Sequence, residues 1–360
     1  MNHKAKRKAF KKQYCLIGIS LFLILLIEGL KSNTLWVEKY YSSVIYPGIS
    51  YFYIILFSWL PFSVGDVVYA FISGVIVYNI FRLIQAAIKF NISKLKLYSL
   101  NLTSFISVLY VVFYLNWGLN YYRRPIEKKY GLEAYQINKD DFLSVLDRYI
   151  DITNNLRADL DLNDRSKDGV KLDIVDIVKK DTLLQDYLCK TQVHAKQPIS
   201  SQLASYFTVS GYFNPFSLEV QVNQLIPKAS FPFVLVHELS HQMGVGFEDE
   251  CNFIAFLTLK NDKDIWYKYS AYYSAVEYLL QVLYADKELF QQYTEKLSEA
   301  VLEDYRYERQ FWTSYRGWID DLSGRFYNSF LQHNNQPEGL QRYSMMARLL
   351  VAWEIKHNQG

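Results

Sequence analysis

The sequence is poor in cysteine, with only Cys15, Cys189 and Cys251 among its 360 residues. So few cysteines exclude the disulfide framework that stabilises many small secreted domains. The chain also lacks a phosphate-binding loop, a dinucleotide-binding fingerprint and any nucleic-acid motif, so nucleic acid is not an expected partner. Its 39 basic and 36 acidic residues nearly cancel, so the net charge says little about partners. What the sequence does contain is long apolar runs and one short polar motif.

Long uncharged runs in the first third of the chain predict membrane spans. Residues 2–12 are basic and residues 13–30 are apolar, which is the pattern of a signal peptide or a signal anchor. No small-x-small cleavage site follows Leu30, so we expect a retained anchor. Two later apolar runs, near residues 64–84 and 99–120, are also long enough to cross a bilayer.

The apolar run at residues 44–62 allows two interpretations. It contains Pro47 and Pro61 and many aromatic residues, so it could lie along the membrane interface or form a fourth span. Basic segments before the first span and after the second favour a cytoplasmic location for both, which requires three spans. We therefore expect a multi-pass cell membrane protein whose C-terminal domain lies outside the cytoplasm. A fourth span would place that domain in the cytoplasm, which four basic residues favour: Arg123, Arg124, Lys128 and Lys129.

A metal-binding motif, His237-Glu238-Leu239-Ser240-His241, lies in the second half of the chain. Pro232 and the apolar residues before the motif predict a buried helix. On that helix His237 and His241 share one face, so both imidazoles can bind one Zn²⁺. Glu238 lies beside the first ligand, where its carboxylate can accept a proton from metal-bound water. The alternative is a helix with two hydrogen-bonded histidines and a capping glutamate, which must place three costly polar groups on one apolar helix.

The residues after the motif point to a third metal ligand. Gly244 and Gly246 can end the helix and reverse the chain. The stretch then resembles the zincins in which HExxH is followed by E-x-x-x-D/N. That resemblance implies Glu248 as the third ligand and Asn252 as the residue that supports a ligand histidine. Here the gap is shorter than in most such enzymes, and Asn stands where Asp is usual.

The short gap also resembles the HExxHxxG turn of the metzincins, but their third histidine would fall at Phe247, which cannot bind a metal. Helix geometry separates the two glutamates that follow. Each residue advances 100°, so Glu248 and Glu250 point about 200° apart, and only one can face the metal. Glu250 is then expected to be a buried structural carboxylate or a helix-start residue. Cys251 points about 60° away from Glu248 and is expected to pack in the core.

Further stretches extend the resemblance over most of the chain. The segment GYFNPF at residues 211–216, Pro227, and NWGLNYYRRP at residues 116–125 are similar to an uncharacterised bacterial family. Its members are membrane-anchored, zincin-like metallopeptidases with HExxH and a glutamate third ligand. The resemblance implies a fold and a metal site, and it implies no particular substrate.

The rest of the chain predicts an α+β, mostly helical fold with a small sheet. Residues 1–120 would form the membrane region, and residues 121–360 a zincin-like catalytic domain. Apolar residues spaced by three and four predict a helix near 140–160, whereas 170–178 could be a short strand or a helix. Residues 217–223 alternate apolar and polar, which predicts a strand with one solvated face. In zincins, the edge strand before the active-site helix pairs with an extended peptide, and the resemblance implies this role here; the alternative is an ordinary strand. After Leu259 the pattern is helical to the end.

These observations predict a membrane-anchored zinc metallopeptidase, with peptide or protein as substrate and the lipid bilayer as partner. Zn²⁺ would be held by His237, His241 and Glu248, and Glu238 would be the general base. Tyr343 or His333, from the C-terminal helices, could donate a hydrogen bond to the oxyanion. One alternative is a non-catalytic membrane scaffold or sensor with a structural zinc site. The other is a zinc hydrolase that acts on a non-peptide bond.

Overall fold

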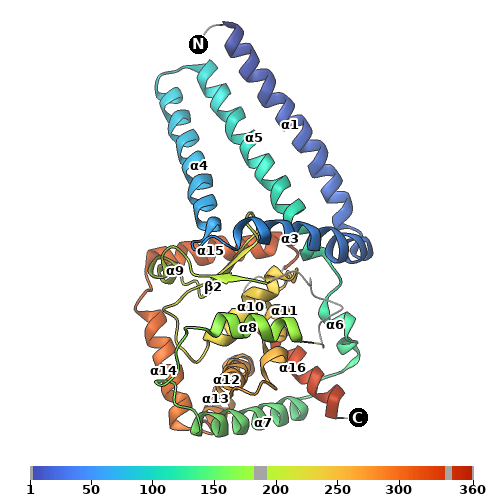
Figure 1. The fold of residues 1–360 in the computed structure, drawn as a ribbon, viewed down its shortest axis with the longest axis vertical. Coiled ribbons are helices and arrows are strands. Elements are labelled where there is room, and N and C mark those ends of the chain that lie inside the picture. Colours follow the sequence, from blue (N-terminus) through green and yellow to red (C-terminus); the bar gives the residue numbers. More distant parts are fainter. Residues whose placement is uncertain (1–2, 182–192, 337–342, 359–360) are drawn as a thin grey trace. The chain divides into compact units, whose positions relative to one another are not determined.

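The computed structural model describes residues 3–181, 193–336 and 343–358. Most of them are helical, and one small three-stranded sheet is present, which confirms the predicted composition of the fold (Figure 1). The chain divides into two compact units. The first comprises Met1–Arg123 together with Asn214–Leu218, and the second comprises Arg124–Phe213 and Glu219–Gly360.

The first unit contains three helices that are long and apolar enough to cross a membrane. They are α1 (His3–Lys31), of which Arg7–Lys31 qualifies, α4 (Val64–Ile88) and α5 (Ile92–Asn116). Helix α5 packs against both α1 and α4. Large apolar side chains on these helices face outward, which suits hydrocarbon rather than water as the surrounding medium. Three helices that could cross a membrane therefore lie where the three spans were predicted, with bounds that differ by up to seven residues.

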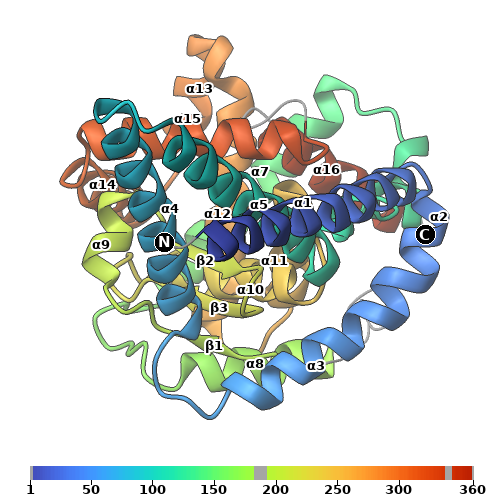
Figure 2. The ribbon, with the colours of Figure 1, turned by 90° about the horizontal axis from the view of Figure 1, so that it is seen from above.

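Residues 34–57 form short helical segments: α2 (Thr34–Trp36), the π-helix η1 (Val37–Ile45) and α3 (Tyr46–Phe57). Among the described residues, this stretch is not one of the three helices that could span a membrane. Figure 1 shows α3 running crosswise to α1, α4 and α5 at the level where they end, and Figure 2 shows it to one side of α1 and α5. After α5 the 3₁₀-helix η2 (Gly118–Tyr122) leads to Arg123, whose guanidinium pairs with the Glu38 carboxylate at 2.8 Å.

Helices dominate the second unit. Those before the sheet and around it are α6 (Ile126–Lys129), η3 (Leu132–Ala134), α7 (Lys139–Ala158), α8 (Val170–Lys180) and α9 (Ser201–Tyr206). Those that follow are α10 (Phe231–Gln242), α11 (Glu248–Leu259), α12 (Ile265–Val282), η4 (Leu283–Ala285), α13 (Lys287–Thr294), α14 (Glu299–Thr313), α15 (Trp318–His333) and α16 (Tyr343–Asn358). The helix near 140–160 and the helical pattern after Leu259 are confirmed. The ambiguous segment at 170–178 is a helix.

The sheet has the order β1-β3-β2, from strands β1 (Ala195–Lys196), β2 (Gly211–Asn214) and β3 (Glu219–Val222). Strand β1 is parallel to β3, with Ala195 opposite Val220 and Lys196 opposite Gln221. The predicted strand at 217–223 is therefore central, and β1 and β2 are the two edge strands. This corrects the sequence-based expectation of an edge strand at 217–223.

The polar face of β3 is also buried, contrary to the prediction of a solvated face. All four residues of the strand are buried. The Lys196 ammonium donates to the Glu219 carboxylate at 2.5 Å, and the Asn223 amide donates to the Ser205 hydroxyl at 2.8 Å. The alternating sequence of this strand thus correctly indicated an apolar face and a polar face. The polar face, however, contacts protein partners instead of water.

Helices α10 and α11 pack against each other and against α12 in the interior of the second unit. Ten of the twelve residues of each of the first two helices are buried. Fully burying one large apolar side chain stabilises a fold by roughly 1.5–3 kcal/mol. This packing fixes the position of both helices, and with them the polar side chains that they carry.

Candidate metal centre

Helix α10 presents both motif histidines on one side. It begins at Phe231 with Pro232 in its first turn, where the missing N–H of proline costs no helical hydrogen bond. His237 and His241 are one turn apart, and their ring centroids are 5.0 Å apart. The predicted start and face of this helix are therefore confirmed.

The turn after α10 brings α11 back toward the histidines. Gly244 has a φ of 92°, in the left-handed region that glycine adopts without strain. Its N–H donates to the His241 carbonyl at 3.0 Å, and the Val245 N–H donates to the Ser240 carbonyl at 3.1 Å. These bonds satisfy carbonyls at the helix end. Helix α11 begins four residues after Gly244, at Glu248.

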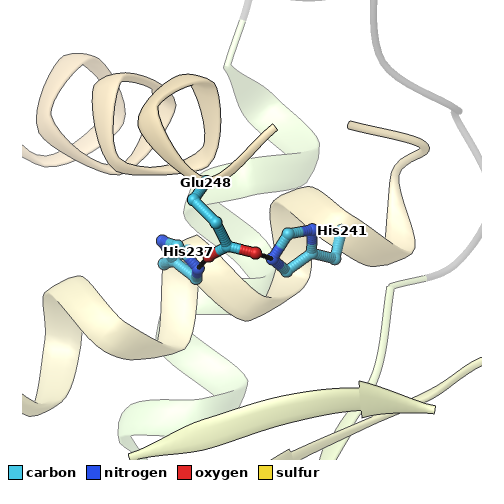
Figure 3. Close-up of side chains that lie close together, drawn as sticks. All are labelled: His237, His241 and Glu248. Carbon is cyan, nitrogen blue, oxygen red and sulfur yellow. Dashed lines mark ion pairs between the residues drawn. The ribbon is translucent and has the colours of Figure 1, made fainter. Parts of the chain in front are cut away.

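The Glu248 carboxylate lies between the two imidazoles (Figure 3). Its Oε2 is 3.1 Å from His237 Nε2, and its Oε1 is 3.4 Å from His241 Nε2. The potential ligand atoms of the three residues all lie within 4.8 Å of one another. This cluster could hold a metal ion, and its donors are two imidazole nitrogens and one carboxylate oxygen.

Each histidine is held through its other ring nitrogen. His237 Nδ1 lies 2.7 Å from the Asn252 Oδ1, and His241 Nδ1 lies 2.9 Å from the Val245 carbonyl oxygen. Both partners are acceptors, so each Nδ1 carries the proton that it donates. The two Nε2 atoms are therefore the ones available to a metal. Such support orients a ligand ring and increases its basicity.

Electrostatics inside the cluster favour an ionised carboxylate. Burial raises the pKa of Glu248, but His241 and His237 outweigh it and bring that pKa well below its usual value. Burial lowers the pKa of His241, but Cys251 and Glu248 beside it raise it well above its usual value. The carboxylate thus attracts positive charge at this point, which is the property that a cation site requires.

Two further residues of α11, Glu250 and Cys251, have structural contacts. Glu250 is buried, and its Oε1 accepts a hydrogen bond from the Ile126 N–H at 2.7 Å, at the start of α6. It is a buried structural carboxylate, as expected. The Cys251 thiol is buried, as predicted, but its Sγ lies 3.4 Å from His241 Nδ1, closer to the cluster than its helix angle indicates. Burial raises the pKa of this thiol to about 12.

Glu238 projects from α10 toward the edge strand. It is buried, and burial raises its pKa to about 7. A Cβ added to Gly211 on β2 would lie only 2.7 Å from the Glu238 Cγ and 2.9 Å from its Oε1. Strand β2 therefore passes directly over this carboxylate, and only glycine fits there. The motif alone gives no sign of this contact, because the two residues come from separate elements.

A second residue that the sequence reasoning missed is Tyr327, on α15. Its hydroxyl donates to the Glu248 Oε1 at 2.8 Å. Tyr343 and His333 were predicted as hydrogen-bond donors to the oxyanion. His333 is exposed on the same helix as Tyr327, and the side chain of Tyr343 lies outside the described residues. Cys189 also lies outside them. Tyr327 is 79 residues from Glu248 along the chain, so no local spacing could have indicated it.

Comparison with known proteins gives one match. No curated protein and no solved structure matches the chain. A family model described as "Protein of unknown function (DUF3810)" matches residues 41–351, which include the candidate spans α4 and α5, the whole of α10 and α11, and Tyr327. The chain therefore belongs to the DUF3810 family.

Proposed function

We propose that the protein is a membrane-anchored zinc metallopeptidase. This proposal is supported by the convergence of His237, His241 and Glu248, and by a Glu238 carboxylate close enough for the charges of all three to shift its pKa. Two imidazoles and one carboxylate are a typical donor set for catalytic zinc, which keeps one position open. Among the described residues the cluster contains three such groups. A structural zinc site would normally require four protein ligands.

Zinc bound by these three residues would supply a Lewis acid and a bound water of lowered pKa. Glu238 would accept the proton of that water and deliver it to the leaving amine. Its carboxylate is held between α10 and β2, so it has little freedom to turn away. Asn252 and the Val245 carbonyl keep the two imidazoles oriented while this proton moves.

The edge strand suggests how an extended substrate would bind. Strand β2 neighbours β3 on one side, and Gly211, Tyr212 and Phe213 are half-buried. An extended peptide that added itself to this edge would run past Glu238 and be held by main-chain hydrogen bonds. Peptide or protein is therefore the proposed substrate class, with β2 in the role that the sequence suggested for residues 217–223.

Tyr327 replaces Tyr343 and His333 as the proposed donor to the oxyanion. Its hydroxyl is already within hydrogen-bond distance of a ligand oxygen. A hydroxyl at that place could turn from Glu248 to a substrate oxygen as negative charge develops there. One positioned donor of this kind contributes on the order of 10²–10³ in kcat.

Substitution of the proposed general base tests the catalytic interpretation. Glu238→Gln in the full-length protein should retain the metal and lower peptide turnover by about 10² or more, because a positioned base contributes roughly 10²–10⁴. Glu303→Gln, at an exposed position on α14, is the matched control and should leave turnover unchanged. Parental turnover in Glu238→Gln would refute the proposal. If the protein binds metal but cleaves no peptide library, a non-catalytic scaffold with a structural zinc site, or a zinc hydrolase that acts on a non-peptide bond, would be favoured instead.

We also propose that the second unit lies outside the cytoplasm. The three candidate spans and the basic segments around them support this orientation. A reporter that is active only in the cytoplasm, fused after Gly360, should therefore stay inactive. A periplasm-active or surface-active reporter at the same position is the control. An active cytoplasmic reporter would establish the opposite orientation.

A further inference from the structure

Helix α15 exposes three large apolar side chains along one face. Trp318, Leu322 and Phe326 are 76%, 62% and 77% exposed. Each is four residues after the previous one, so on a helix they lie within about 80° of one another. Such a row on a helix outside the membrane spans is unusual, because contiguous exposed apolar surface in soluble units marks interaction sites.

A neighbouring element extends this surface. The Ser323 hydroxyl of α15 donates to the Phe207 carbonyl at 3.1 Å, so the end of α9 lies against α15. Phe207 is 43% exposed and Leu203 is 56% exposed. We call these five side chains the α15 face: Trp318, Leu322, Phe326, Leu203 and Phe207.

The opposite side of α15 is fixed to the rest of its unit. Leu331 is buried, and Tyr327 donates its hydrogen bond to Glu248. Tyr327 is nine residues after Trp318, which places the two side chains about 180° apart on the helix. One rigid helix therefore carries the Tyr327 hydroxyl on one side and the apolar row on the other.

We propose that the α15 face docks onto the lipid surface of the membrane in which the chain is anchored. Three helices of this same chain are long and apolar enough to hold it in a bilayer, so lipid is always within reach at high effective concentration. Trp, Phe and Leu on one face of an amphipathic helix are the side chains that enter the boundary between headgroups and acyl chains.

Charged side chains of both signs lie at the border of the α15 face, because Asp321 is exposed beside the arginines. Arg316, just before the helix, and Arg325, which lies about 20° from Trp318, are both exposed. Asp320 accepts from the Gly317 N–H at 2.6 Å, so this carboxylate caps the helix start. Arginines beside an inserted apolar face add attraction to anionic headgroups. Lipid contact would also steady the helix that carries Tyr327, a consequence that rests on the proposed function.

The test uses the full-length protein in nanodiscs that contain phosphatidylglycerol and phosphatidylcholine with brominated acyl chains. The Trp318 signal is the difference in emission between the parent and Trp318→Phe. Brominated lipid should quench this difference signal by at least about twofold, because an inserted indole meets the acyl chains. Aqueous iodide should quench it little. Phe326→Ser should weaken the quenching by brominated lipid, since it removes the neighbouring apolar side chain.

A matched control moves the probe to another helix. Tyr307 on α14 is 61% exposed, so Tyr307→Trp in the Trp318→Phe background should be quenched by iodide and not by brominated lipid. Quenching of Trp318 by iodide alone would overturn the proposal. Protection from both quenchers that appears only with two chains in one disc would overturn it as well, in favour of contact with a second copy. Neither readout depends on peptide cleavage.

Discussion

The spans of the first unit and the α10–α11 pair of the second unit are both strongly apolar, but their side chains meet different surroundings. On α1, Phe22 and Leu25 are 68% and 65% exposed. On α10 and α11, ten of twelve residues are buried in each helix. The spans are about twice as long as these two helices. Length therefore separates an apolar helix that faces lipid from one that faces protein.

The buried polar side chains of α10 and α11 are a second difference from the apolar helices of the first unit. An unpaired polar group buried in protein costs roughly 1–3 kcal/mol. On α10 and α11 three polar side chains avoid this cost because each has a hydrogen-bond partner. His237 pairs with Asn252, His241 with the Val245 carbonyl, and Glu250 with the Ile126 N–H. A buried helix that carries several costly polar groups, each held in place, is where chemistry is expected.

Substitution of one phenylalanine from each region would test this difference in surroundings. The buried one has the largest expected effect on the free energy of unfolding. Phe256 on α11 is fully buried, with ring centroids 5.3 Å from Tyr149 and 5.4 Å from Tyr272. Phe256→Ala should lower the free energy of unfolding by about 3–5 kcal/mol. Phe22→Ala on α1 should change it little, because lipid tails are as apolar as the side chain. Thermal unfolding in nanodiscs measures both, and equal losses would break the comparison.

Substitutions of Glu248 and Glu250 on α11 would distinguish a metal ligand from a structural carboxylate. Glu248→Ala should weaken metal retention by roughly 10–100-fold or more, given the losses that follow removal of mere supporting residues. Glu250→Ala should leave metal affinity nearly unchanged and lower stability instead, because it leaves the Ile126 N–H without its acceptor. Metal titration and thermal unfolding separate the two effects. The reverse order of metal loss would sink the assignment of the third ligand.

The close approach of β2 to α10 predicts a smaller loss of stability than Phe256→Ala. Gly211→Ala should cost about 1–3 kcal/mol, because its Cβ meets Glu238 at 2.7 Å. Displacement of Glu238 should lower turnover by up to about 100-fold while the metal is retained. Gly324→Ala on α15 is the control, since a Cβ there meets nothing within 4 Å. Unchanged turnover in Gly211→Ala would mean that Glu238 does not act from this position.

Local patterns predicted the parts of the site that depend on one helix or one turn. The spacing of His237 and His241, the reversal at Gly244 and the separation of Glu248 from Glu250 all follow from helix geometry. The resemblance to zincins, rather than geometry, implied that Asn252 supports one of the histidines, and Asn252 lies 2.7 Å from His237. Within these short segments, the backbone leaves side chains few directions to point.

Contacts between distant segments could not be predicted in this way. The partner of Glu219 is Lys196 on another strand, so alternation in residues 217–223 did not show that its polar face is buried. Likewise, Gly211 meets Glu238 and Tyr327 meets Glu248 only after the chain has folded. Periodicity indicates that two faces differ, but only tertiary packing decides what each face contacts.

Elemental analysis and zinc X-ray absorption of the purified protein would show directly whether His237, His241 and Glu248 bind zinc. We expect one zinc per chain, with nitrogen and oxygen neighbours at about 2.0–2.2 Å and no sulfur. Chains without metal, or a sulfur neighbour at about 2.3 Å that places Cys251 among the ligands, would contradict it.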